Sequence, residues 1–255
     1  MLRGLPIVSV SCVFAGLLAV ASVARAADEP EAKPNTLTKE EKKAGWKLLF
    51  DGKSLKGWRG YKMKKPPAAW KVSDGLLTFE NKAGDEAAGG GDLITQAQYD
   101  SFELTLDWRI SAGGNSGVMY HVSESEDRPW KTGPEMQILD NQKHKDGKSP
   151  LTSAGACYGL YPPTKDLTRP VGEWNSARLV VEGMKVEHWL NGEKVVEYEL
   201  WSDDWKARVA KSKFKDMPKF GTFKKGPICL QDHSDRVEFR NIKIRAAAAA
   251  GEREK

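Results

Sequence analysis

The chain has 255 residues, a formal net charge of +5 at neutral pH and 40% hydrophobic residues. This length suits one domain or two small ones. Nine tryptophans and eight phenylalanines supply enough apolar area for a sizeable core. Basic residues alternate with acidic ones, as in "KEEKK" and "EKVVEYEL", which favours a mixed solvated surface and argues against nucleic acid as a partner.

Residues 1–26 have the features of a secretory signal peptide. Arg3 precedes an apolar stretch from Ile7 to Val23, and the small residues Ala24 and Ala26 occupy the positions that a signal peptidase requires. We therefore predict cleavage after Ala26 and export to the periplasm or the extracellular space. The alternative is a retained membrane anchor, but the apolar stretch is short for a stable span.

Two further segments are predicted to lie outside the folded domain. Residues 27–44 are charged, contain proline and have few apolar side chains, which is typical of a flexible linker with one helical turn at "TKEEKK". Residues 246–255 are of low complexity, and we expect them to be disordered. The predicted domain is therefore residues 45–245.

Within this domain the dominant hydrophobic period is two, which predicts strands. Residues 101–110, "SFELTLDWRI", alternate apolar and polar side chains. Residue pairs typical of turns separate the predicted strands at Asp74-Gly75, Glu182-Gly183 and Asn191-Gly192. The last of these pairs favours a tight β-hairpin. The final strand, "DRVEFRNIKIR", changes parity near Asn241, which indicates a bulge.

Helical patterns are scarce in the sequence. Residues 202–214 are the best candidate, with Ser202 as N-cap and acidic residues in the first turn. Many short strands, frequent turns and little helix predict an all-β fold, namely an antiparallel β-sandwich of the jelly-roll type. We expect a ligand to lie across one concave face of such a sandwich.

Two cysteines, Cys157 and Cys229, remain after the predicted cleavage. An exported compartment permits a disulfide between them, and two buried free thiols are an equally good interpretation. We find no spacing of Cys and His that is typical of a zinc site.

Two stretches place polar side chains on strands where a half-buried sheet would not need them. "GGNSGVMYH" (113–121) is rich in glycine and carries Asn115 and His121 on one face. "GPEMQILDN" (133–141) carries Glu135 and Gln137 on one face, and Asp140 reaches that face only if a bulge intervenes. An ordinary solvent-facing strand is the alternative for both.

Two later stretches complete this polar set. "SAGACYGLYPP" (153–163) reads as an ordered loop whose Tyr158 can stack on a sugar ring. "GPICLQDHSDR" (226–236) places Gln231 and His233 on one face, where an imidazole can be a base, a ligand or part of a structural pair. The alternative is a loop anchored by buried tyrosines in the first case and a structural pair in the second.

At these residues the chain resembles a known family, DUF1080, also described as the 3-keto-disaccharide hydrolase domain. The resemblance covers nearly all of residues 46–245. It implies a concanavalin A/laminarinase-like jelly roll, export, and activity on glycosides that a separate oxidoreductase has already oxidised at C3. It rests on seven motifs that occur in order: "LLFDGKSLKGWRGY", "GDLIT", "FELTLDWRIS-GGNSGVMYH", "PEMQILDN…H", "AGACYGLYPP", "GEWNSARLVVEGMKVEHWLNGEKVVEYEL" and "GPICLQDH…VEFRNIKIR".

The implied chemistry assigns roles to the acids and imidazoles. A C3 ketone acidifies the hydrogen at C2, so a base can remove it, the C1 substituent can leave from the enolate, and water can add to the enone. This requires a base, an electrophile for the enolate oxygen and an acid for the leaving group. We predict Glu135 and His144 as the proton-transfer pair, with Asp140 as a third catalytic residue that orients them.

A divalent metal ion can serve as the electrophile in this scheme. Imidazole and carboxylate ligands suit such an ion, and our candidate ligands are His121, Glu135 and Asp140. We expect no organic cofactor, and we expect a monomer or a small oligomer. The predicted substrate contacts share amide, imidazole, guanidinium or aromatic groups: Arg59, Asn115, Gln137, Trp130, Tyr158, Trp205, Gln231 and His233.

Two alternatives to this function stay open at the level of sequence. A laminarinase-like retaining glycosidase uses a Glu-x-Asp-x-x-Glu pattern, which Glu135, Gln137 and Asp140 approach with an amide at the middle position. A carbohydrate-binding module without catalysis suits the jelly roll and the abundant tryptophans, because fold does not determine function.

Overall fold

The computed structural model describes Met1 and residues 33–80 and 90–247. The predicted signal peptide and most of the predicted C-terminal tail lie outside the described residues, so both stay predictions. Among the described residues, no helix is long and apolar enough to cross a membrane.

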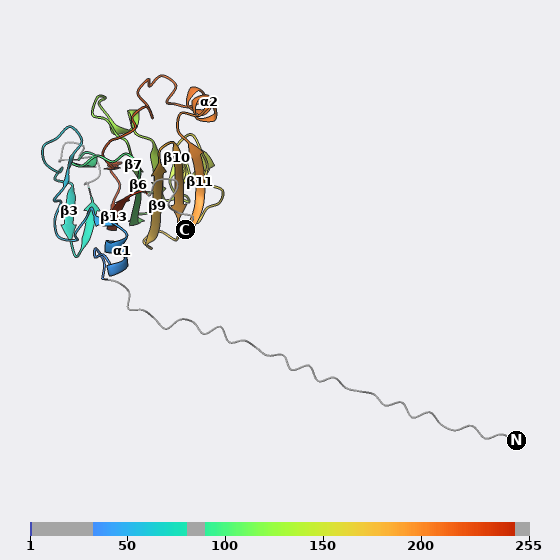
Figure 1. The fold of residues 1–255 in the computed structure, drawn as a ribbon, viewed down its shortest axis with the longest axis horizontal. Helices are drawn as coiled ribbons and strands as arrows, with labels where there is room; N and C mark the ends of the chain where they lie inside the picture. Colours follow the sequence, from blue (N-terminus) through green and yellow to red (C-terminus); the bar gives the residue numbers. More distant parts are fainter. Residues whose placement is uncertain (2–32, 81–89, 248–255) are drawn as a thin grey trace. The chain divides into compact units, whose positions relative to one another are not determined.

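The strands form two antiparallel sheets, an arrangement that Figure 1 shows together with the few helices. Sheet A has the order β11 (Glu193–Glu199), β10 (Lys185–Leu190), β9 (Asn175–Glu182), β6 (Phe102–Ile110), β13 (Val237–Ala246), β4 (Leu76–Phe79) and β3 (Trp70–Ser73), and β1 (Lys47–Leu48) pairs with β13. Sheet B has the order β2 (Trp58–Gly60), β5 (Leu93–Thr95), β12 (Cys229–Leu230), β7 (Asn115–Met119) and β8 (Glu135–Leu139).

Helices account for little of the described chain. The α-helices are α1 (Lys39–Lys43) and α2 (Asp203–Lys211), and the 3₁₀-helices are η1 (Pro129–Lys131), η2 (Lys145–Lys148) and η3 (Pro150–Thr152). Helix α2 begins as predicted, because the Ser202 side chain accepts a hydrogen bond from the backbone N–H of Trp205. The predicted fold class, an antiparallel β-sandwich with little helix, is confirmed.

The core lies between the two sheets and follows the predicted alternation. The apolar residues of β6, from Phe102 through Leu106 to Ile110, are buried and face the core. From sheet B, Val118 and Met136 join the same cluster. Since successive side chains of a strand point to opposite faces, the residues directly before and after Val118 and Met136 face away from this core.

The predicted turns and the bulge are present where the sequence placed them. Asp74 and Asn191 adopt positive φ angles of 54° and 50°, each followed by a glycine with positive φ, as tight hairpin turns require. The pairing of β13 with β6 shifts register between Arg240 and Lys243, around Asn241. This shift is the bulge that the change of parity predicted.

The two cysteines are buried free thiols. Cys157 belongs to the main core, and Cys229 belongs to a smaller apolar cluster on the outer side of sheet B. Burial raises the pKa of both thiols, which keeps them protonated and unreactive. Of the two interpretations that the sequence allowed, the structure has the one without a disulfide.

Part of the segment that we expected to be a flexible linker contacts the domain. The backbone N–H of Asn35 donates to the side chain of Asn241, and the backbone N–H of Asn241 donates to the side chain of Asn35, at 2.7 and 2.8 Å. The Asn35 amide also donates to the carbonyl of Gly75. These bonds fasten the segment to the bulge of β13 and to the β3–β4 turn.

This attachment predicts a measurable loss of stability in Asn35→Ala. The substitution removes two side-chain hydrogen bonds at a buried position, so we expect the free energy of unfolding to fall by about 1–3 kcal/mol in urea titrations. Thr36→Ala is the matched control, because the exposed Thr36 hydroxyl bonds only within its own segment. Equal stability of the Asn35→Ala and Thr36→Ala proteins would show that the segment is not fastened in solution.

Candidate functional site

The candidate site lies on the outer face of sheet B. Glu135 is paired with Met119 across β8 and β7, and Gln137 is paired with Gly117. The strand β12 continues this floor on the other side of β7, where the backbone N–H of Gln231 donates to the carbonyl of Gly117. The alternation that directs Met136 into the core therefore presents Glu135 and Gln137 on the opposite face.

A pocket of about 250 Å³ opens above this floor. Its walls come from connecting segments: η1, η2, the loop after η3, the segment after α2 and the residues that follow β12. The pocket is lined by Asn115, Trp130, Glu135, Gln137, Asp146, Tyr158, Lys213, Gln231 and His233.

Glu135 lies at the centre of the pocket floor and is 7% exposed. Its carboxylate extends over Gly117, and a Cβ atom on that glycine would stand 2.0 Å from Oε1. With the Gln137 amide oriented so that its hydrogen bonds are satisfied, Nε2 donates to Glu135 Oε1 at 3.1 Å and to the carbonyl of Ser116 at 2.9 Å. A residue without a side chain at 117 thus provides the space that Glu135 occupies.

Burial raises the pKa of Glu135 to about 8, because the low-polarity surroundings disfavour its charged form. The ammonium group of Lys213 acts in the opposite direction, and the carboxylates of Asp92 and Asp146 add to the rise. A carboxyl group with such a pKa accepts and returns protons near neutral pH.

Lys213 brings a positive charge to the rim of the pocket. Its Nζ atom lies 4.1 Å from the centroid of the Tyr158 ring and 5.3 Å from that of the Trp130 ring, positions suited to cation–π interaction. Burial among these walls lowers its pKa, although the residue as a whole is exposed, while Glu135 and Asp146 favour the charged form. The pocket therefore pairs a buried acid with a nearby cation.

Tyr158 connects the loop wall to the floor. Its hydroxyl donates to Asp146 Oδ2 at 3.0 Å, and its backbone N–H donates to the carbonyl of Glu135 at 3.0 Å. Burial raises the pKa of the Tyr158 hydroxyl, and Asp146 adds to this rise. Tyr158 thus stays protonated and holds the Asp146 carboxylate in place.

Two amide oxygens in the pocket have no hydrogen-bond donor among the described residues: Asn115 Oδ1 and Gln231 Oε1. Both residues are at least nine-tenths buried. Buried acceptors are nearly always paired in folded proteins, so these two oxygens are suited to hydroxyl groups of a bound molecule.

Two of the three histidines predicted for the site, His233 and His144, lie at the pocket or beside it. His233 lines the pocket and is exposed. The ring of His144 stands next to it, with 6.0 Å between the ring centroids. His144 also begins η2, where its Nδ1 accepts a hydrogen bond from the backbone N–H of Asp146, so it is positioned beside the pocket and does not line it.

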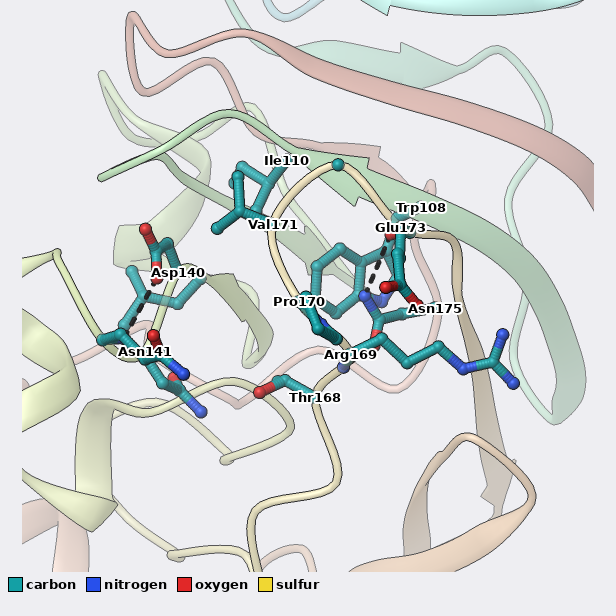
Figure 2. Close-up of a pocket in the computed structure, with 13 residues that line it drawn as sticks. Trp108, Ile110, Asp140, Asn141, Thr168, Arg169, Pro170, Val171, Glu173 and Asn175 are labelled. Carbon is teal, nitrogen blue, oxygen red and sulfur yellow. Dashed lines mark hydrogen bonds between the residues drawn. The ribbon is translucent and has the colours of Figure 1, made fainter.

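Asp140 is not in this pocket. The pairing of β7 with β8 is regular from Glu135 to Leu139, so the bulge that Asp140 required is absent. Its carboxylate accepts backbone N–H groups of Gly113, Gln142 and Lys143 at 2.7, 3.0 and 3.3 Å. Asp140 organises the chain after β8 and lines a different pocket, which Figure 2 shows.

Three more predicted residues lie elsewhere for identifiable reasons. His121 has a positive φ of 51° and is buried, and its Nε2 makes a 2.7 Å hydrogen bond with the carbonyl oxygen of Asp100. Arg59 forms a bidentate ion pair with Glu124, at 2.7 and 2.6 Å. Trp205 is 3% exposed and belongs to the main core.

The predicted metal ligands His121, Glu135 and Asp140 are consequently not brought together. In the part of the chain that the structure describes, no other group of three or more His, Cys, Asp or Glu residues is arranged to hold a metal ion. The involvement of a divalent ion stays a prediction.

Residues 45–245 match the family described as the 3-keto-alpha-glucoside-1,2-lyase-like domain. The chain belongs to this family. The match spans the predicted domain and confirms the resemblance noted in the sequence.

Relatives of this lyase-like domain include a protein from Bacteroides thetaiotaomicron named 3-keto-disaccharide hydrolase. It is 36% identical over 227 residues, which cover 79% of this chain and 78% of the relative. A crystal structure from Parabacteroides distasonis, provisionally named a glycosyl hydrolase, is 36% identical with a TM-score of 0.77, over 85% of this chain and all of that one. A Bacillus subtilis protein of unknown function, described as having a galectin-like fold, shares the fold alone. It is 12% identical with a TM-score of 0.50, over 85% of this chain and 96% of that one.

Sequence reasoning missed two residues that line the pocket of the lyase-like domain. Lys213 follows α2, far along the chain from Glu135, and no local pattern distinguishes it from the neighbouring lysines. Asp146 lies in the charged stretch after β8, where its contact with Tyr158 depends on the fold of two loops. A buried carboxyl directly before β5, that of Asp92, was also missed, although it acts on the pKa of Glu135.

Proposed function

We propose that this lyase-like domain cleaves 3-keto-glycosides by elimination followed by addition of water. The observation that carries the proposal is the buried carboxyl of Glu135, with its pKa raised to about 8, in a pocket that also holds the Lys213 ammonium and two unpaired amide oxygens. The relative named 3-keto-disaccharide hydrolase supports the choice of substrate.

Glu135 acts as the base in this proposal. Its carboxylate takes the proton from C2 of the sugar, and the electron pair of that bond forms the enolate with the C3 ketone. A base whose pKa lies near the working pH combines a useful ionised fraction with a strong tendency to accept the proton. The Gln137 amide, which donates to Glu135 Oε1, aims the carboxylate.

Lys213 stabilises the charge that develops. The Lys213 ammonium group lines the same pocket as Glu135. It stabilises the enolate oxygen as negative charge develops on that oxygen. The side-chain oxygens of Asn115 and Gln231 accept hydrogen bonds from hydroxyl groups of the sugar, and these bonds fix the ring over Glu135. The interaction with Lys213 strengthens in the transition state, which is the condition for acceleration.

The leaving group departs from C1 as the enolate collapses to an enone. We assign its proton to the imidazole pair at the rim, with His233 facing the pocket and His144 behind it. Water then adds to the enone, which restores the sugar at C1 and C2. The balance is one glycoside and one water consumed, and one alcohol and one free 3-keto sugar formed.

The ordinary retaining glycosidase fits the site less well. That mechanism requires two carboxyl groups about 5 Å apart on either side of the scissile bond. The second acid of the sequence pattern, Asp140, binds backbone N–H groups outside the pocket. The other acid in the pocket, Asp146, already accepts the Tyr158 hydroxyl.

The proposal has consequences for the partners of the protein. A glycoside becomes a substrate only after oxidation at C3, so a separate oxidoreductase must supply it. Export by residues 1–26 would place both steps outside the cytoplasm, and this localisation is part of the proposal.

The direct test is incubation of the purified protein with a 3-keto-glucoside, with and without EDTA, beside the unoxidised glucoside and a β-glucan. We expect consumption of the keto-glucoside alone, with release of the free 3-keto sugar, and the EDTA arm tests the predicted metal. Cleavage of the β-glucan would favour the retaining glycosidase. Binding without turnover in every arm would favour a carbohydrate-binding module.

The charge of Lys213 should affect the pH dependence of kcat/KM. Glu135 must be ionised to act as a base, so the rising limb of kcat/KM against pH should have its midpoint at about 8. Because the ammonium of Lys213 lowers the pKa of Glu135, Lys213→Met should move this midpoint up by about one pH unit. Lys215→Met, an exposed neighbour on the same segment, is the control. An unchanged midpoint would remove Lys213 from the proposed mechanism.

A further inference from the structure

A second pocket lies at one end of the sandwich, where the inner face of β6 meets the end of β8 beneath residues 168–173. Its volume is about 150 Å³, enough for one small organic molecule. Figure 2 shows this pocket with the loop that carries Pro170 and Val171 arching over it. It shares no lining residue with the pocket of Glu135.

The wall of this second pocket contains an unpaired hydrogen-bond donor. Trp108 is 1% exposed, and its indole Nε1 has no partner among the described residues. The ring lies beside Pro170 and Asn175 in Figure 2. Because buried N–H groups are nearly always paired, the Trp108 N–H suits an acceptor oxygen of a bound molecule.

The loop above the pocket is held in place by two asparagines. Asn175 Oδ1 accepts the backbone N–H of Arg169 and the side-chain amide of Asn191, each at 2.8 Å. Asn191 also donates to the carbonyl of Leu167 at 2.7 Å. The pocket is therefore formed before any ligand arrives, as is usual for small-molecule sites.

The charges around the pocket favour a neutral ligand. The Asp140 carboxylate is occupied by backbone N–H groups, and the Arg169 side chain extends away from the pocket in Figure 2. Glu173 also lines the pocket but is exposed to solvent at its rim. The remaining walls include the apolar side chains of Ile110, Leu139 and Val171. Apolar walls, one buried donor and a polar rim match a molecule with C–H faces and hydroxyl oxygens.

We propose that this pocket is a second carbohydrate site that binds one neutral sugar ring. An oxygen of the sugar accepts the Trp108 N–H, and its C–H face packs against Pro170 and Val171. The site is separate from the catalytic pocket, so the protein holds a sugar at the end of the sandwich independently of turnover.

The test is a titration of the full chain with glucose and with 3-keto-glucose, followed by calorimetry and by saturation-transfer NMR. We expect at least one of the two sugars to bind, and Trp108→Phe, which keeps the aromatic ring and removes the N–H, to weaken binding up to about tenfold. Val171→Trp should abolish binding at this pocket, because it fills the pocket from its exposed rim, and should lower the calorimetric stoichiometry by one site. Met184→Trp, the same change at another exposed apolar residue, should leave it intact.

Val171→Trp and Met184→Trp together separate this inference from the proposed function. The Glu135 pocket also binds sugar, so the second site is the share of binding that is lost in Val171→Trp and kept in Met184→Trp. That loss supports the second site whether or not the protein cleaves a 3-keto-glucoside. The inference is overturned if neither sugar binds, or if affinity and stoichiometry are unchanged in both Trp108→Phe and Val171→Trp.

Discussion

Glu135→Gln is expected to lower kcat for a 3-keto-glucoside about a thousandfold, because the amide cannot take the proton from C2. The side chain keeps its shape, so the pocket should keep its affinity for the substrate. Steady-state kinetics together with product analysis measure the effect. Full turnover by this variant would end the proposed mechanism.

Stability offers a second readout of the same substitution. Because the folded protein raises the pKa of Glu135 to about 8, it binds this proton more tightly than the unfolded chain does. Glu135 therefore disfavours folding progressively as the pH rises from its ordinary pKa, about 4.3, towards 8. Glu135→Gln should remove this decline, which urea titrations at pH 5 and pH 8 will measure.

Glu103→Gln is the matched control. Glu103 is also buried, at 5% exposed, but it lies on β6 and forms ion pairs with Arg178 and Arg245. We expect its turnover to stay near that of the unchanged protein while its stability falls. Equal loss of turnover in both variants would mean that the effect of Glu135→Gln arises from the fold.

Gly117→Ala is expected to lower kcat about a hundredfold, although Gly117 has no side chain to react. The added Cβ would stand 2.0 Å from Glu135 Oε1 and 2.7 Å from its Cδ, so the carboxylate must move. A displacement of about 1 Å at a reacting group is sufficient for a loss of this size. The crowding should also lower the free energy of unfolding by about 1–3 kcal/mol.

A double-mutant cycle shows whether Gly117 acts through Glu135. In the Glu135→Gln background, Gly117→Ala should cause little further loss of kcat, because the base that it displaces is already absent. Independent, multiplied losses would mean that Gly117 contributes by another route, such as direct contact of its backbone with the substrate.

The floor of the site could be predicted because strand alternation is a local property. A period of two is sufficient to place Asn115, Glu135 and Gln137 on one face. All three line the pocket, where the side-chain oxygen of Asn115 has no hydrogen-bond donor among the described residues. The same reasoning predicted the hairpin at Asn191 and the bulge at Asn241, since both depend on a few neighbouring residues.

The walls could not be predicted, because they depend on where long connections return. Lys213 reaches the pocket from the segment after α2, and Asp146 reaches it through η2. Asp140 was placed in the site on the assumption that β8 contains a bulge, since one extra residue would turn Asp140 to the face of Glu135. The strand is regular, so the prediction for Asp140 is wrong. His121 departs from alternation because its backbone is in the left-handed region, which a period of two does not reveal.

The division between floor and walls has a consequence for changing the specificity of this protein. The proposed base lies on paired strands, whereas Trp130, Tyr158 and Lys213 come from connections that adjoin those strands. Engineering for larger aglycones can therefore begin at Trp130, on η1, and leave the hydrogen bond between Gln137 and Glu135 intact. Reactivity and substrate range are thereby separable targets, one encoded in the sheet and the other in the loops.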